Sequence, residues 1–265
     1  MNIVVRFILY FICCIAPAAE WICAQTPYPF DVDLIPAALT NDAVAVVRNS
    51  FQSVEVKPGG FVIYNYKYSI TILNADGKER GQLNVYFNAS QTIKSSRGKI
   101  FDRKGKLVKE IPAADFKRNN LVNGYSFFLD AMVLHYSPSV SEYPYTIEYE
   151  YEIKDMNSLY FPTWYPHVAY NVAVENSSLL ISNDPSFPLR YKQYQWEENA
   201  EKHEEKNRHV YKWNIKNRSA IRLESFSLPF DRIAPNIKIA PVRFSYEGTT
   251  GEFRDWDEYG KMMYR

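Results

Sequence analysis

Strict alternation of apolar and polar residues is the clearest pattern in this chain. In residues 61–73, one face carries Tyr64, Tyr66, Tyr68, Ile70 and Ile72, and the other carries polar residues between them. Residues 145–154 repeat the pattern, with tyrosine or isoleucine at odd positions and threonine, glutamate or lysine at even ones. A period of two places alternate side chains on opposite faces of a β-strand. Both segments are therefore predicted to be strands with one buried and one solvated face, as in an antiparallel sheet.

Turn residues separate these strands from others. Residues 102–105 (DRKG) lie between two short apolar runs and predict a tight hairpin. Residues 74–77 (NADG) predict a turn after the strand at 61–73, from which residues 83–87 would pair back. Residues 197–208 are almost wholly charged, and we expect an exposed hairpin loop there. Further strands are predicted at residues 43–56, 177–182, 189–196, 209–215 and 242–246.

About ten short strands at regular spacing predict an all-β fold. The expected architecture is a large antiparallel two-sheet β-sandwich over residues 42–248. Residues 25–41 are polar and contain three prolines, so we expect an extended lead-in before the sandwich. No internal repeat or linker-like composition divides the sandwich into smaller domains.

The last residues change to a helical period. Phe253, Trp256, Tyr259 and Met263 recur three or four residues apart. This spacing predicts an amphipathic helix of about three turns within residues 252–265. An apolar stripe on such a helix needs a surface to cover it, so these four residues form a candidate interaction surface.

A second cluster of aromatic residues lies at 160–166 (YFPTWYP). Its two prolines exclude a central strand. Tyr160, Trp164 and Tyr165 would bind a glycan or a peptide if the loop is exposed, because aromatic rings pack well against apolar ligand faces. The same rings would fill one end of the sandwich if the loop is buried. Exposure of Trp164 distinguishes the two interpretations.

The first 24 residues have the pattern of a secretory signal peptide. A short basic start precedes an apolar run at residues 7–19, and Ala24 is a suitable residue for cleavage. Lipid attachment at Cys23 is an alternative, although the bulky Trp21 and Ile22 precede it. The apolar run is shorter than the about 20 residues of a membrane-spanning helix. We therefore expect an exported protein, periplasmic or extracellular, with no transmembrane segment after cleavage.

Composition narrows the classes of function. The 21 tyrosines, 16 phenylalanines and 5 tryptophans can build a large core, and 10 glycines are too few for a collagen-like or glycine-rich repeat protein. A formal net charge of +1 gives no electrostatic reason to expect nucleic acid as a partner. All three cysteines, Cys13, Cys14 and Cys23, lie in the signal. The mature chain would then lack disulfides, thiolate metal sites and cysteine nucleophiles.

No motif marks a catalytic or cofactor site. Gly59 and Gly60 lie between predicted strands rather than before a helix, so they do not fit a phosphate-binding loop. His203 and His209 lie among glutamates, where a metal site and a solvated loop would both explain them. An orphan hydrolase using a carboxylate pair or a Ser-His-Asp set would need residues that nothing in the sequence marks. We predict no catalytic residue, cofactor or metal.

Several short segments follow one another in a characteristic order. They are residues 143–151 (YPYTIEYEY), 211–217 (YKWNIKN), 224–229 (ESFSLP), 234–235 (AP), 239–241 (IAP) and 256–260 (WDEYG). Together they resemble the bacterial family known as domain of unknown function 3857, over about residues 42–265. The resemblance implies an exported β-sandwich of the kind that commonly precedes a transglutaminase-like, papain-related domain. No cysteine remains here for that domain's nucleophile, and residues 249–265 would lead into such a domain.

The sequence thus favours an exported non-catalytic module that mediates protein interaction or accompanies a transglutaminase-like protein or domain. It would be either a standalone sandwich or the front part of a larger or split gene product. The candidate interaction surface consists of Tyr160, Trp164, Tyr165, Phe253, Trp256, Tyr259 and Met263. The alternatives are glycan or peptide binding through the aromatic loop, and an orphan hydrolase.

Overall fold

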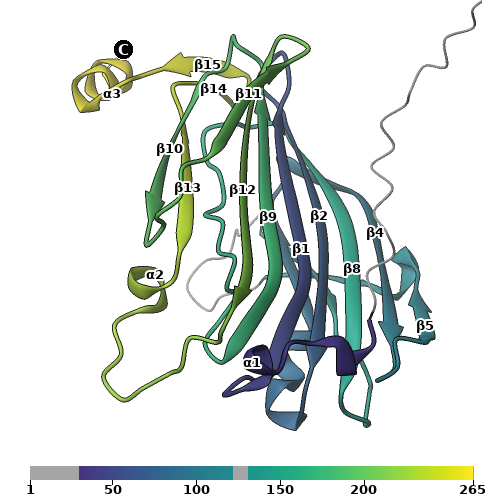
Figure 1. Cartoon of the computed structure of the whole chain (residues 1–265). Coiled ribbons are helices and arrows are strands. Elements are labelled where there is room, and N and C mark those ends of the chain that lie inside the picture. The colour runs from purple at the N-terminus through teal and green to yellow at the C-terminus, as the bar shows by residue number, and fades with distance from the viewer. Residues whose placement is uncertain (1–29, 122–130, 265) are drawn as a thin grey trace, which may run out of the picture.

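A computed structural model describes residues 30–121 and 131–264 (Figure 1). The predicted signal peptide lies outside these residues. The strands are β1 (Ala45–Val56), β2 (Val62–Ile72), β3 (Leu83–Phe87), β4 (Gln91–Phe101), β5 (Leu107–Ile111), β6 (Lys117–Asn120), β7 (Met132–Tyr136), β8 (Tyr145–Asp155), β9 (Val172–Asn183), β10 (Leu189–Tyr194), β11 (Glu201–Glu205), β12 (Arg208–Arg218), β13 (Asn236–Pro241), β14 (Arg243–Tyr246) and β15 (Thr249–Glu252). The helical segments are η1 (Val32–Leu34), α1 (Ala37–Thr40), η2 (Ala75–Gly81), η3 (Ala113–Asp115), α2 (Phe230–Ile233) and α3 (Trp256–Met263).

A single large sheet organises the molecule. Its eight strands run in the order β11-β12-β9-β1-β2-β8-β4-β5. The predicted all-β, sandwich-like fold is confirmed. The sheet is mixed rather than purely antiparallel, because β1 pairs in parallel with β9. Parallel neighbours need a long connection, and here the chain forms β2 to β8 before it returns to the free side of β1.

Two small sheets cover one face of the large sheet, which we call the inner face. The sheet β3-β7-β6 packs at β8, where Phe116 and Tyr136 lie against the ring of Tyr149. The sheet β10-β13 packs at β12, where the ring of Tyr191 meets that of Trp213 edge-on at 4.9 Å. The second layer of the sandwich is therefore in two pieces. In the strand order of the large sheet, β9, β1 and β2 lie between the two points of attachment.

The N-terminal segment covers one end of the opposite, outer face. Leu39 of α1 packs with Ile35 and Ala43 against Val46 and Ala173 of the central strands. This part of the predicted lead-in holds two short helical segments, η1 and α1. Turns of this kind let the segment bury leucine and isoleucine on the sheet.

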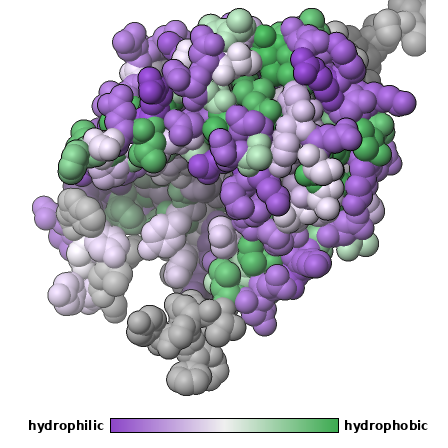
Figure 2. Space-filling model, turned by 90° about the horizontal axis from the view of Figure 1, so that it is seen from below, coloured by the Kyte–Doolittle hydropathy of each residue, from purple (hydrophilic) through white to green (hydrophobic). Residues whose placement is uncertain are grey.

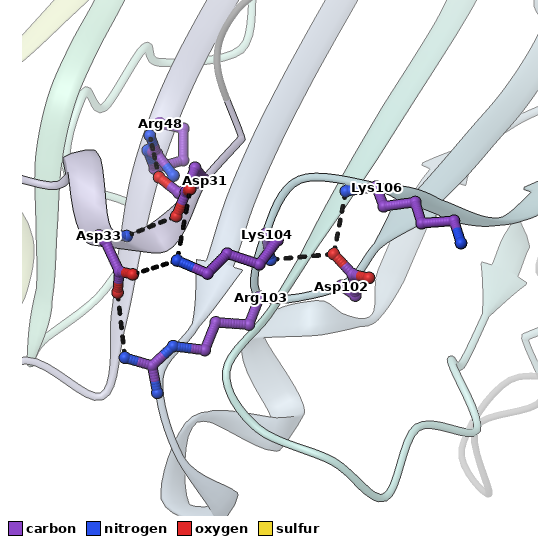
Figure 3. A network of polar contacts seen from close by, with 7 residues as sticks. All are labelled: Asp31, Asp33, Arg48, Asp102, Arg103, Lys104 and Lys106. Carbon is purple, nitrogen blue, oxygen red and sulfur yellow. Dashed lines mark hydrogen bonds and ion pairs between the residues drawn. The ribbon is translucent and has the colours of Figure 1, made fainter.

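A network of polar contacts ties this segment to the β4–β5 hairpin (Figure 3). Asp33 accepts hydrogen bonds from Arg103 at 3.0 Å and from Lys104. The backbone N–H of Val32 donates to the Arg103 carbonyl at 2.9 Å. Two charge-assisted hydrogen bonds to one carboxylate hold the pKa of Asp33 below its usual range. The network fixes where the lead-in crosses the sheet.

Some local predictions were wrong. Residues 74–77 cap and begin the helical segment η2 rather than a hairpin turn, with Asn74 accepting hydrogen bonds from two following backbone N–H groups. β3 consequently pairs with β7 and not with β2. The charged residues 197–208 contain the strand β11, which can be charged on both faces because it lies at the edge of the sheet. The C-terminal helix is shorter than expected, and residues 249–252 form β15.

Candidate functional site

The aromatic loop places its three candidate residues in different environments. Trp164 is only 3% exposed, its ring lies 5.5 Å from that of Trp196, and its backbone pairs with Ile237. Trp164 therefore forms no exposed platform and belongs to the core at one end of the sandwich. Tyr165 is half-buried beside Phe230, with ring centroids 6.1 Å apart. Tyr160 is 74% exposed and is available for contact.

The C-terminal candidates lie on an arm formed by β14, β15 and α3. The ring of Phe253 packs against Phe244 of β14 at 5.5 Å and against Tyr259 of α3 at 5.2 Å. Asp255 caps the helix by accepting a hydrogen bond from the N–H of Glu258 at 2.9 Å. Trp256 and Met263 are the first and last residues of α3, and their side chains lie outside the described part of the structure.

A third group of residues was not singled out by sequence analysis. On the inner face, cross-strand neighbours in the middle of the sheet carry polar groups rather than aliphatic ones. Gln52 of β1 lies opposite Tyr66 of β2, which lies opposite Tyr151 of β8. One step along the strands, Ser50 lies opposite Tyr68. We call Ser50, Gln52, Tyr66, Tyr68 and Tyr151 the tyrosine floor.

The rings and polar groups of the tyrosine floor are in contact. The rings of Tyr66 and Tyr151 stack with centroids 4.6 Å apart. The Gln52 side-chain amide donates to the Tyr66 hydroxyl at 3.4 Å. All three tyrosines remain half-buried, although the aliphatic residues further along the same strands are fully buried. The floor thus lies between the two small sheets without being sealed by them.

The tyrosine floor is uncharged at neutral pH. Burial raises the pKa of Tyr66, Tyr68 and Tyr151 above the usual value for tyrosine. The charge of Arg80 also acts on the floor, where it opposes the rise in the pKa of Tyr68. The arrangement therefore offers hydroxyl groups, one amide and aromatic faces, without an ionised side chain.

The histidines that sequence analysis considered as metal ligands do not come together in one site. His203 faces Glu205 at 4.0 Å and His209 faces Glu204 at 3.6 Å, as separate pairs on the exposed β11–β12 hairpin. Among residues 30–121 and 131–264, no group of three or more histidine, cysteine or carboxylate side chains could hold a metal ion. In the same residues, no helix is long and apolar enough to span a bilayer.

Comparison with known proteins assigns a family. A family model for a domain of unknown function with a solved structure, DUF3857, matches residues 59–222, which is more than half of the chain. The chain belongs to the DUF3857 family. The match runs from the β1–β2 turn to just beyond β12, so it includes the three tyrosines of the floor. No curated protein matches this DUF3857 chain.

Solved structures support the fold of this DUF3857 chain. A protein from Parabacteroides distasonis, described as a proposed protease, matches with a TM-score of 0.61 at 17% identity. The match covers 77% of this chain and 41% of that chain, so this chain spans well under half the length of its relative. An M1 zinc metallopeptidase from Deinococcus radiodurans matches with a TM-score of 0.34 at 9% identity, over 74% of this chain and 42% of the peptidase. That TM-score is too low to bear on the fold or the function.

Proposed function

We propose that this DUF3857 chain is an exported, non-catalytic module that accompanies a transglutaminase-like, papain-related partner through its C-terminal arm. The main observation behind this proposal is the position of α3. In Figure 1, α3 extends beyond β14 and β15, to the side of the large sheet and away from its strands. A helix with aromatic and methionine positions at helical spacing gains stability when another surface covers that stripe.

The base of the arm is well held. Ser245 of β14 accepts a backbone hydrogen bond from Ser158 at 2.8 Å, and its own N–H donates to the Ser158 hydroxyl at 2.9 Å. Arg190 of β10 donates to the carbonyl of Arg254 at 2.6 Å. These contacts, with the edge-to-face rings of Phe244 and Phe253, hold the segment that leads into α3. A fixed helix costs less entropy on binding than a free peptide.

Two further observations support the proposal. The Parabacteroides distasonis protein combines a similar fold with additional chain, and it is described as a proposed protease. The first 24 residues have the pattern of a secretory signal. An exported sandwich that works beside a papain-related domain agrees with both. Lipid attachment at Cys23 would keep the same module at a membrane surface.

Binding to the transglutaminase-like proteins encoded in the same genome tests the proposal. Mature protein, residues 25–265, is immobilised, and each purified partner is titrated by biolayer interferometry. The double variant Trp256→Ala/Met263→Ala should weaken binding by at least about tenfold, because both positions lie on the apolar stripe. The matched control, Asp257→Ala/Lys261→Ala, alters exposed positions of the same helix and should change affinity less than about twofold. Absence of binding to every such protein, or equal loss in both variants, would overturn the proposal.

A further inference from the structure

The tyrosine floor is unusual for the inner face of a sandwich. Towards one end of the central strands this face carries Val47, Ile70 and Ile147, and towards the other it carries Val54 and Ile153, all buried. Between these aliphatic ends lie the hydroxyls and the amide of the floor. A core that only had to be filled would gain more from aliphatic side chains there, because each buried polar group must find a partner.

Within the described part of the chain, two buried polar atoms beside the floor have no such partner. The Tyr64 hydroxyl belongs to a side chain that is 3% exposed, and its ring lies 6.4 Å from that of Tyr66. The Ser177 hydroxyl is fully buried and lies opposite Ser50 in the β1–β9 register. A buried hydroxyl without a hydrogen bond destabilises the fold. The core beside the floor therefore carries more polar groups than its own packing satisfies.

The molecule is visibly hollowed on one side. Figure 2, seen from below, shows a recess that enters between two walls of the molecule. The attachment points of the two small sheets, at Tyr149 on β8 and at Trp213 on β12, leave β1 and β2 between them, with Ser50, Gln52, Tyr66 and Tyr68 of the floor. The half-buried state of Tyr66, Tyr68 and Tyr151 agrees with a floor that solvent or a ligand can reach.

We propose that the tyrosine floor is a binding site for a neutral saccharide. Sugars present many hydroxyl groups together with apolar C–H faces, and the floor presents tyrosine hydroxyls, a glutamine amide and aromatic rings. The stacked Tyr66 and Tyr151 offer an aromatic surface for a C–H face. None of the five floor side chains is ionised, so desolvation at the floor costs a neutral ligand less than an acidic or basic one.

The position of the floor in the sheet also favours a sugar over a peptide. An extended peptide usually binds by adding its backbone to an unpaired strand edge. β1, β2 and β8 are each paired on both sides, so their backbone groups are already used. Only side chains are available at the floor, which suits a ligand recognised by hydroxyl and amide groups.

A printed array of neutral glycans, followed by calorimetry with the best-bound glycan, tests this site. Mature protein is expected to bind at least one neutral glycan. Gln52→Leu and Tyr66→Phe each remove one hydrogen-bonding group and keep the shape of the side chain. Each variant should weaken binding by about tenfold, the loss typical of one well-placed hydrogen bond. Tyr86→Phe alters an exposed tyrosine of β3 and should leave the affinity within about twofold.

The outcomes separate this inference from the proposed function. Trp256→Ala/Met263→Ala lies on the arm and should bind the glycan as well as the unaltered protein does. Absence of binding to every neutral glycan would overturn the inference, as would equal affinity of the floor variants and the unaltered protein. Preferential binding of uncharged tetrapeptides, measured in parallel, would also overturn it. If Tyr66→Phe fails to fold, Tyr68→Phe replaces it in the comparison.

Discussion

Arg48 is the largest side chain that the structure buries completely. Its guanidinium donates to Glu175 at 2.7 Å, to the Thr71 hydroxyl at 3.4 Å and to the Asp31 carbonyl at 3.4 Å. Figure 3 shows it beside the contacts that hold the lead-in. A buried charge is tolerated only where it is paired and hydrogen-bonded. One residue thus joins the N-terminal segment to three strands of the sheet.

Replacing Arg48 is therefore expected to be costly. Arg48→Met leaves the Glu175 carboxylate, which is only 20% exposed, without its cation. We expect the free energy of unfolding to fall by about 3 kcal/mol, measured by urea denaturation followed by tryptophan fluorescence. Arg97→Met is the control, because Arg97 makes a similar 2.8 Å pair with Glu150 on the solvated outer face. That variant should lose less than about 1 kcal/mol, and equal losses would contradict the argument.

The tyrosines show which aspects of burial the alternating pattern can predict and which it cannot. Alternation correctly placed Tyr64 and Tyr149 in the core, where both are almost fully buried. The same pattern treated Tyr66 and Tyr151 as equivalent to them, yet both remain half-buried. Period two identifies the face on which a side chain lies, but it carries no information about what covers that face. The sequence therefore held no signal that separates the floor tyrosines from the core tyrosines Tyr64 and Tyr149.

Among the elements, the β1–β2 turn depends on two adjacent glycines with different surroundings. Gly59 and Gly60 have φ of 89° and 79°, in the left-handed region that favours glycine. A Cβ at Gly59 would meet no atom within 4 Å, whereas at Gly60 it would lie 2.5 Å from the ring of Phe187 and 2.7 Å from Ser245. The second glycine is where the turn fits closely against the β9–β10 connection and β14.

Because the surroundings of the two glycines differ, substitution by alanine is expected to destabilise the protein by different amounts at Gly59 and Gly60. Gly59→Ala adds only backbone strain, about 1 kcal/mol. Gly60→Ala adds that strain and a steric overlap, so we expect a loss of about 3 kcal/mol or more. Thermal denaturation of both variants under identical conditions measures the difference. A Gly60→Ala protein as stable as Gly59→Ala would show that the turn does not pack against Phe187 in solution.

Strand positions were easier to predict than strand partners. β2 and β8 lie within one residue of the predicted limits, because a dozen alternating residues leave little freedom of register. The pairing of β3 with β7 and of β1 with β9 joins segments far apart in the chain, and local pattern contains nothing about such pairs. The helix α3 was predicted from its spacing, but its distance from the sheet could only come from the structure.

For the whole molecule, burial of many tyrosines has a consequence for pH. Burial raises the pKa of Tyr145 to about 12, and it also raises the pKa of Tyr64, Tyr66, Tyr68, Tyr149 and Tyr151. In the unfolded chain these groups ionise near the ordinary tyrosine pKa of 10.0. Above that pH the unfolded state releases protons that the folded state keeps, so stability is lost as pH rises.

We expect the free energy of unfolding to be insensitive to these groups below pH 10 and to fall steeply above it. Each buried tyrosine contributes a slope of up to about 1.4 kcal/mol per pH unit. Urea midpoints measured between about pH 9 and pH 11 test this. Tyr145→Phe should make the fall of the unfolding free energy with pH shallower, by about the contribution of one buried tyrosine. Full ionisation of all tyrosines near pH 10 with retained circular dichroism would contradict the expectation.

The parallel pairing of β1 with β9 also bears on how the chain reaches its fold. β1 can form a hairpin with β2 early, but its other edge is completed only when residues 172–183 arrive. Contacts between such distant segments slow folding, because the chain loses the entropy of closing a long loop before these contacts can stabilise it. The N-terminal half therefore stays incompletely folded for most of synthesis. If the chain is exported, as we propose, that delay keeps it in a state suited to translocation.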